Sequence, residues 1–108
     1  MFALFIRLSD PDKLDDLLTL LLELGMDDAL VISGTSMNAV LEKDVPLFAG
    51  LLSAFPRTHP TGELILTVSP DRLTVERLWK LAREIGVDFS DPDSARLIAI
   101  KTESFPEE

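Results

Sequence analysis

The chain has 108 residues, of which 46% are apolar and 27% are charged, so we expect one ordinary globular domain and exclude a disordered or fibrous protein. Its 19 acidic residues outnumber 10 basic residues that are spread along the chain, and the formal charge of −9 would repel nucleic acids and anionic lipids. It has no cysteine, which excludes disulfides, thiolate metal sites and a cysteine nucleophile and fits a reducing compartment.

The first predicted element is a strand at residues 2–8, where "FALFIRL" is an apolar run of strand-forming residues. Arg7 interrupts this run, so it does not have the pattern of a signal peptide. No uncharged apolar stretch of the chain approaches the ~20 residues that a membrane helix needs. We therefore expect a cytoplasmic protein without membrane insertion.

A helix should follow this strand, capped at its start by Ser9 or Asp10 and ended by Gly25. Its leucines recur at helical spacing, which predicts one face packed against a core. The second strand is predicted at residues 28–33, where "DALVIS" is again rich in strand formers.

An insertion without the polar character of a surface loop comes next. Gly34 should end the second strand, and residues 39–41 are a candidate short strand. The stretch "PLFAGLLSAF" then predicts a helix at residues 46–55 that has almost no polar face. Burying its five large apolar side chains is worth roughly 8–15 kcal/mol as an upper bound, which rivals the total stability of a small domain.

The apolar side chains of this insertion could be buried against three surfaces: the domain's own sheet, a neighbouring subunit or a membrane. Glu42 and Asp44 beside the helix argue against a membrane, because interfacial helices favour basic flanks. Apolar residues on both faces of the predicted strands favour contact between subunits instead. The predicted oligomer interface consists of Leu47, Phe48, Leu51, Leu52 and Phe55.

The second half of the chain repeats the pattern of the first. A strand at residues 62–68 is followed by a helix that begins near residues 69–71 and ends at Gly86, and a last strand is predicted at residues 95–101. Two such β-α-β units predict an α+β fold, a ferredoxin-like (βαββαβ) sandwich with a helical insertion between its second and third strands. One face of that sheet would lack helices.

The order of elements, the strand "ALVISG" and above all "DVPLFAGLLSAF" resemble the PII-like family of small signalling proteins, and the resemblance extends over nearly the whole chain. It implies a single PII-like domain at residues 1–108, with a T-loop-like insertion at residues 34–61 and an acidic tail at residues 102–108. It also implies a homotrimer that binds a small effector, often an adenine nucleotide in this family, in clefts between subunits. The T-loop then changes shape to engage a protein partner.

The chain departs from nucleotide-binding PII proteins at three places. The Gly-rich "TGxxGDGK" loop is replaced by "IGVDFSDPDSARL", the C-terminal arginine pair is absent, and there is no T-loop tyrosine. Arg96 falls where the lysine of that loop lies in the family. The cofactor therefore remains unassigned, because three aspartates in this loop would repel a polyphosphate.

A cluster of small and polar residues follows the second strand in "GTSMN". It offers close backbone approach, hydrogen-bonding groups and an adaptable apolar contact, which suits a small-molecule cleft, although a plain polar turn is the commoner setting for such residues. With two arginines that could contact an anion, the predicted ligand-binding residues are Gly34, Thr35, Ser36, Met37, Asn38, Arg57 and Arg96.

No catalytic or metal site is predicted. His59 is the only histidine, and without cysteines it lacks the usual partners of a transition-metal ligand. We expect a signalling protein that binds a small anionic ligand and is not an enzyme. The alternatives are a ligand-free trimeric scaffold whose insertion helix only stabilises the oligomer, and a small hydrolase that uses a carboxylate pair.

Overall fold

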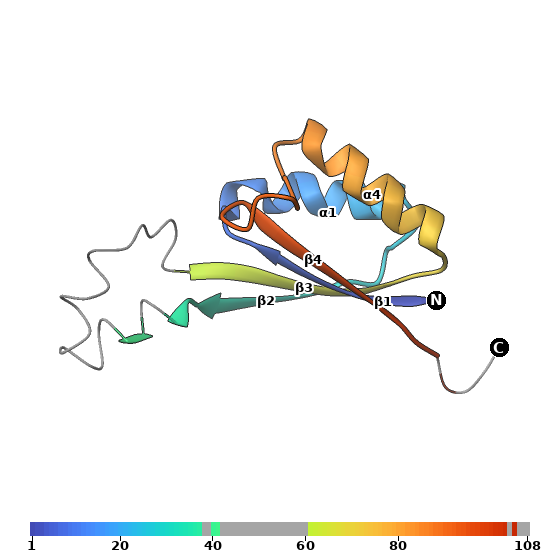
Figure 1. Cartoon of the computed structure of the whole chain (residues 1–108), viewed down its shortest axis with the longest axis horizontal. Helices are drawn as coiled ribbons and strands as arrows, with labels where there is room; N and C mark the ends of the chain where they lie inside the picture. Colours follow the sequence, from blue (N-terminus) through green and yellow to red (C-terminus); the bar gives the residue numbers. More distant parts are fainter. Residues whose placement is uncertain (38–39, 42–60, 104, 106–108) are drawn as a thin grey trace.

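The computed structural model describes residues 1–37, 40–41, 61–103 and 105. They form an α+β domain with a four-stranded antiparallel sheet and two α-helices (Figure 1). This confirms the predicted α+β class, and the arrangement is compatible with a ferredoxin-like sandwich. In chain order the elements are β1 (Phe2–Leu8), a 3₁₀ turn (Pro11–Lys13), α1 (Leu14–Glu23), β2 (Leu30–Thr35), β3 (Thr61–Ser69), α4 (Arg72–Glu84) and β4 (Ala95–Lys101).

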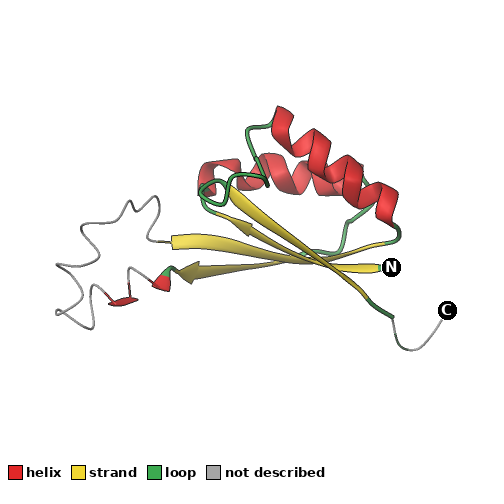
Figure 2. Cartoon of the chain, in the orientation of Figure 1, coloured by secondary structure: helices red, strands yellow, loops and turns green. Residues whose placement is uncertain are grey.

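The strands lie in the order β2-β3-β1-β4, so β1 and β3 are central and β2 and β4 are the edges. All three neighbouring pairs are antiparallel. Both helices lie on one side of the sheet, as Figure 2 shows. Within the described residues no helix covers the other side, which we call the open face.

The core lies between the helices and the sheet. Because side chains alternate across a strand, every second residue of β1 points toward the helices, and Leu4, Ile6 and Leu8 are at most 1% exposed. These side chains pack in one cluster with residues of both helices, among them Leu17 and Leu78. The leucine stripe predicted for the first helix is confirmed in part: Leu17 and Leu21 are buried, whereas Leu22, which the spacing also placed in the stripe, is 62% exposed.

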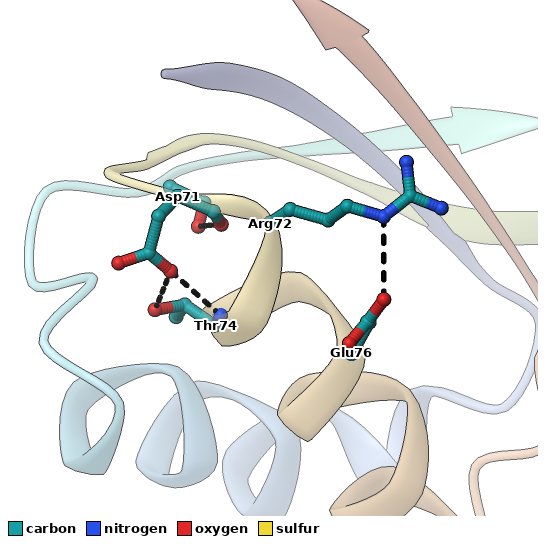
Figure 3. A network of polar contacts seen from close by, with 5 residues as sticks. Asp71, Arg72, Thr74 and Glu76 are labelled. Carbon is teal, nitrogen blue, oxygen red and sulfur yellow. Dashed lines mark hydrogen bonds and ion pairs between the residues drawn. The ribbon is translucent and has the colours of Figure 1, made fainter.

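The predicted capping residues lie at the helix ends, except that Asp10 caps the 3₁₀ turn and not α1. The Asp10 carboxylate accepts a hydrogen bond from the amide of Asp12 at 2.9 Å, whereas α1 follows Lys13, whose side chain makes no capping bond. Gly25 ends the first helix with a φ of +87°. The Asp71 carboxylate accepts from both the amide and the hydroxyl of Thr74, at 2.8 and 2.7 Å (Figure 3). Gly86 closes α4 with a φ of +85°.

The predicted boundaries of the second strand were wrong. β2 begins at Leu30 rather than at residue 28, and it continues through Gly34 and Thr35, which pair with Gly62 and Thr61 of β3. A glycine weakens a strand by its backbone entropy, but here the ladder with β3 carries the backbone past Gly34.

The candidate short strand at residues 39–41 was also wrong where the structure describes it. Val40 and Leu41 are helical, and the amide of Val40 donates to the carbonyl of Ser36 at 3.1 Å. That i to i−4 bond is the helical one, so the backbone turns here instead of extending. The helix predicted at residues 46–55 lies outside the described residues.

Candidate functional site

The open face of the sheet is apolar over most of its area. Register places Leu30, Leu66, Phe5 and Ile98 in one row across the four strands. Leu30 is 60% exposed and Ile98 is 55% exposed, so water contacts this row on both edge strands. Further exposed apolar side chains of the same face are Ile32, Val68 and Ile100.

The next row of the open face carries two arginines. It consists of Ile32, Leu64, Arg7 and Arg96, in which Arg7 of β1 lies directly opposite Arg96 of β4. Cβ atoms of directly opposite residues are about 4.5–5.5 Å apart, and like charges in that position destabilise a sheet. Both side chains are exposed, and neither makes an ion pair or hydrogen bond with another of the described residues. We call these two residues the arginine pair.

A hollow lies beside Arg7, where β2 ends and β3 begins. Gly34 is paired with Gly62, so no side chain covers the open face at this point of the two strands. The hollow has a volume of about 320 Å³. The side chains around it are mainly uncharged, and the residues that line it are Arg7, Ile32, Gly34, Thr35, Ser36, Met37, Gly62, Glu63 and Leu64.

The two glycines differ in the space around them. A Cβ atom on Gly34 would meet no other heavy atom within 4 Å, whereas one on Gly62 would lie 3.3 Å from the carbonyl oxygen of Leu8. A Cβ atom on Gly62 would therefore press on the backbone of Leu8, which would have to move by a few tenths of an ångström, whereas Gly34 has no such contact. The backbone geometry at Gly34 would accept a side chain, and that side chain would enter the hollow.

Four of the seven predicted ligand-binding residues line this hollow, namely Gly34, Thr35, Ser36 and Met37. Arg96 is not part of the lining, but it lies opposite Arg7, which is. Asn38 and Arg57 lie outside the described residues. So do the predicted interface residues Leu47, Phe48, Leu51, Leu52 and Phe55.

Sequence reasoning missed Arg7. Its run "FALFIRL" identified it only as a charge inside an apolar strand. The useful signal was its position in the strand. Because alternate residues of a strand share a face, Arg7 lies on the same face as Phe5, and Arg96 lies on the same face as Ile98. The pairing of the two arginines could be found only with the register of β1 against β4.

Glu63 is the acidic residue of the lining, and its carboxylate is already engaged. It accepts a hydrogen bond of 2.7 Å from the hydroxyl of Ser33 on the neighbouring strand. The two residues are direct cross-strand partners. By alternation they belong to the other face of the sheet from Arg7, so Glu63 does not neutralise the arginine pair.

Two of the three aspartates of the loop at residues 88–94, Asp88 and Asp91, accept hydrogen bonds within the loop itself. Asp88 accepts hydrogen bonds from the hydroxyl and the amide of Ser90, which together lower the pKa of its carboxyl below the ordinary value of 3.8. Asp91 accepts from the amide of Asp93 at 3.0 Å. Such turns shape a surface loop, and they leave no row of free backbone amides like that of a phosphate-binding loop.

The polar network at the start of α4 is likewise structural. Arg72 and Glu76 form an exposed ion pair of 3.2 Å across one helical turn, beside the Asp71 cap (Figure 3). Exposed pairs of this kind contribute little to stability. These charges lie at the start of a helix, whereas the hollow is built mainly from strand residues.

Other kinds of site find no support in the part of the chain that the structure describes. No group of three or more histidine, aspartate or glutamate residues is placed to hold a metal ion there. Among the same residues no helix has the length and apolar character needed to cross a membrane. The chain matches no protein-family model, and no curated protein shows significant similarity to it.

Proposed function

We propose that the chain is a PII-like signalling or regulatory protein with a ferredoxin-like fold and a helical insertion between β2 and β3. In this proposal three copies associate through their open faces, and a small anionic ligand binds in a cleft between subunits. Binding then changes the T-loop-like region at residues 34–61. The order of the strands and helices supports the fold, and the character of the open face supports the assembly.

The apolar open face is the observation that carries the proposal. Six of its large apolar side chains are between about one third and two thirds exposed in the single chain. Covering them would contribute on the order of 1 kcal/mol each, or roughly 6 kcal/mol per chain. That is comparable with the whole stability of a small domain, about 5–15 kcal/mol. The six side chains are Phe5, Leu30, Ile32, Val68, Ile98 and Ile100.

The position of the hollow connects assembly with ligand binding. It opens on the same face as the apolar rows, at the end where β2 and β3 leave the sheet. A second copy that covered this face would border the hollow and turn it into a cleft between subunits. A ligand there would touch Thr35 and Gly62, which lie at the two ends of the connecting segment. Binding would therefore act on both ends of the region that is proposed to respond.

Light scattering at micromolar concentration tests the assembly, and a panel of ligands tests the binding. Three chains of 12.0 kDa should give a mass of about 36 kDa. A ligand at 100 times its dissociation constant should add ~2.7 kcal/mol to the free energy of unfolding. A monomer of 12.0 kDa would contradict the assembly. A trimer that no nucleotide, carboxylate, bicarbonate or divalent cation stabilises would instead indicate a scaffold.

A further inference from the structure

The arginine pair is a concentration of positive charge in an acidic protein. The chain as a whole has a formal charge of −9, yet Arg7 and Arg96 lie directly opposite each other without a carboxylate partner among the described residues. They also stand on an apolar face, with Leu64 next to Arg7 and the Phe5–Ile98 row beside them. Two like charges in this position raise the free energy of the folded chain unless an anion lies between them.

The hollow begins at this pair. Arg7 forms part of its wall, Gly34 and Gly62 leave its floor without side chains, and Ile32 and Leu64 add apolar surface. Its volume of about 320 Å³ suits a small molecule, because typical ligand sites begin at about 300 Å³.

We propose that Arg7 and Arg96 together bind the oxyanion group of a small organic anion, a carboxylate or a phosphate, whose remaining atoms occupy the hollow over Ile32 and Leu64. This rests on the ligand-binding part of the proposed function and names both its binding residues and its ligand class. A guanidinium group presents a planar set of donors that matches two oxygens of a carboxylate or phosphate. Two such groups on neighbouring strands can hold one oxyanion from two sides.

The repulsion between the two arginines and the binding of an anion are coupled at this site. Without an anion, each arginine repels the other, so removing one of them should make the folded chain more stable. With an anion, the same removal takes away half of the binding contacts. An arginine with a purely structural role would behave differently, because its replacement would lower stability whether or not an anion is present.

Four probes in chloride buffer of low ionic strength test the proposal by calorimetric titration and by thermal unfolding. Inorganic phosphate and acetate present little more than the oxyanion group. Glycerol 3-phosphate adds a glycerol group to the phosphate, and butyrate adds a longer alkyl chain to the carboxylate. Phosphate and carboxylate preferences are thereby separated from each other. Arg7→Gln and Arg96→Gln are compared with Arg77→Gln, which removes the same charge from an exposed position on α4. Gly34→Val fills the hollow where a Cβ atom meets nothing within 4 Å.

We expect Arg7→Gln and Arg96→Gln each to weaken binding about ten- to a hundredfold and to raise the unfolding temperature of the anion-free protein. Arg77→Gln should leave the affinity unchanged. Gly34→Val should weaken the binding of glycerol 3-phosphate and butyrate and leave the binding of phosphate and acetate unchanged. The proposal is overturned if Arg77→Gln weakens binding as much, or if no probe binds. It is also overturned if either arginine variant destabilises the anion-free protein and dissociates it, since the pair would then contact a carboxylate of a second copy.

The mass of each sample, measured alongside, separates this inference from the proposed assembly. A monomer that still binds anions through Arg7 and Arg96 would refute the trimer and keep the site. A trimer that binds no anion would refute the site and keep the assembly.

Discussion

Gly34 near the end of β2 lies directly opposite Gly62 near the start of β3, and neither residue places a side chain on the open face. Only one of the two glycines lies close to a neighbouring backbone atom. The carbonyl oxygen of Leu8 would lie 3.3 Å from a Cβ on Gly62, whereas Gly34 faces open space. The hollow is therefore open at Gly34 because glycine has no side chain, although the backbone there would accept a larger residue.

This difference predicts opposite effects of the same substitution. Gly34→Ala should raise the free energy of unfolding by about 0.5–1 kcal/mol, because alanine loses less backbone entropy on folding than glycine. Gly62→Ala should lower it, since β1 or β3 must shift to relieve the contact with Leu8. Urea denaturation followed by the fluorescence of Trp79, the single tryptophan, measures both. Equal effects of the two changes would contradict this account of the glycines.

Neighbouring leucines of α1 should differ sharply in their contribution to stability. Leu21 is 1% exposed and belongs to the core, whereas Leu22 is 62% exposed. Leu21→Ala should cost about 2–5 kcal/mol, through lost burial and the cavity that it leaves. Leu22→Ala should change the free energy of unfolding by less than about 0.5 kcal/mol. A large loss at Leu22 would mean that a surface covers it in solution.

The Asp71 cap predicts a pH-dependent contribution to stability. The amide and then the hydroxyl of Thr74 lower the pKa of this carboxyl below its ordinary value of 3.8. A lowered pKa in the folded state stabilises the fold above pH 3.8, and the stabilisation is lost as the pH falls through the lower value. Asp71→Ala should thus lower the urea midpoint at pH 7 and make little difference near pH 2.

Asp27→Ala is the control for this prediction, because Asp27 is exposed and is not a capping residue. It should leave the urea midpoint close to that of the unchanged chain at both pH values. If the effect of Asp71→Ala were the same at pH 7 and pH 2, its carboxylate charge would not be what stabilises the start of α4.

Local chemistry made much of the fold predictable from the sequence. Asp10, Gly25, Asp71 and Gly86 mark the helix ends because capping and left-handed turns depend on residues close together in the chain. The core stripe of α1 follows from helical periodicity in the same way.

The register between strands that are distant in the chain could not be predicted from the sequence. The extension of β2 through Gly34 depends on β3, and the pairing of Arg7 with Arg96 depends on the register of β1 against β4. A shift of one residue would move either arginine to the other face, so composition and spacing could not identify the pair. The PII-like resemblance and the interface helix at residues 46–55 remain predictions.

If the apolar open face is a contact between copies of the chain, a charge placed on it should dissociate the assembly, and the mass of two charge variants measures this. Leu30→Lys places a charge on the open face at a side chain that is 60% exposed, and Leu73→Lys makes the same exchange on α4 at one that is 64% exposed. By light scattering at micromolar concentration, we predict that Leu30→Lys dissociates the trimer to 12.0 kDa subunits while Leu73→Lys keeps about 36 kDa. If both variants kept the mass of the unchanged protein, or if that protein were itself a monomer, the open face would not be the subunit interface.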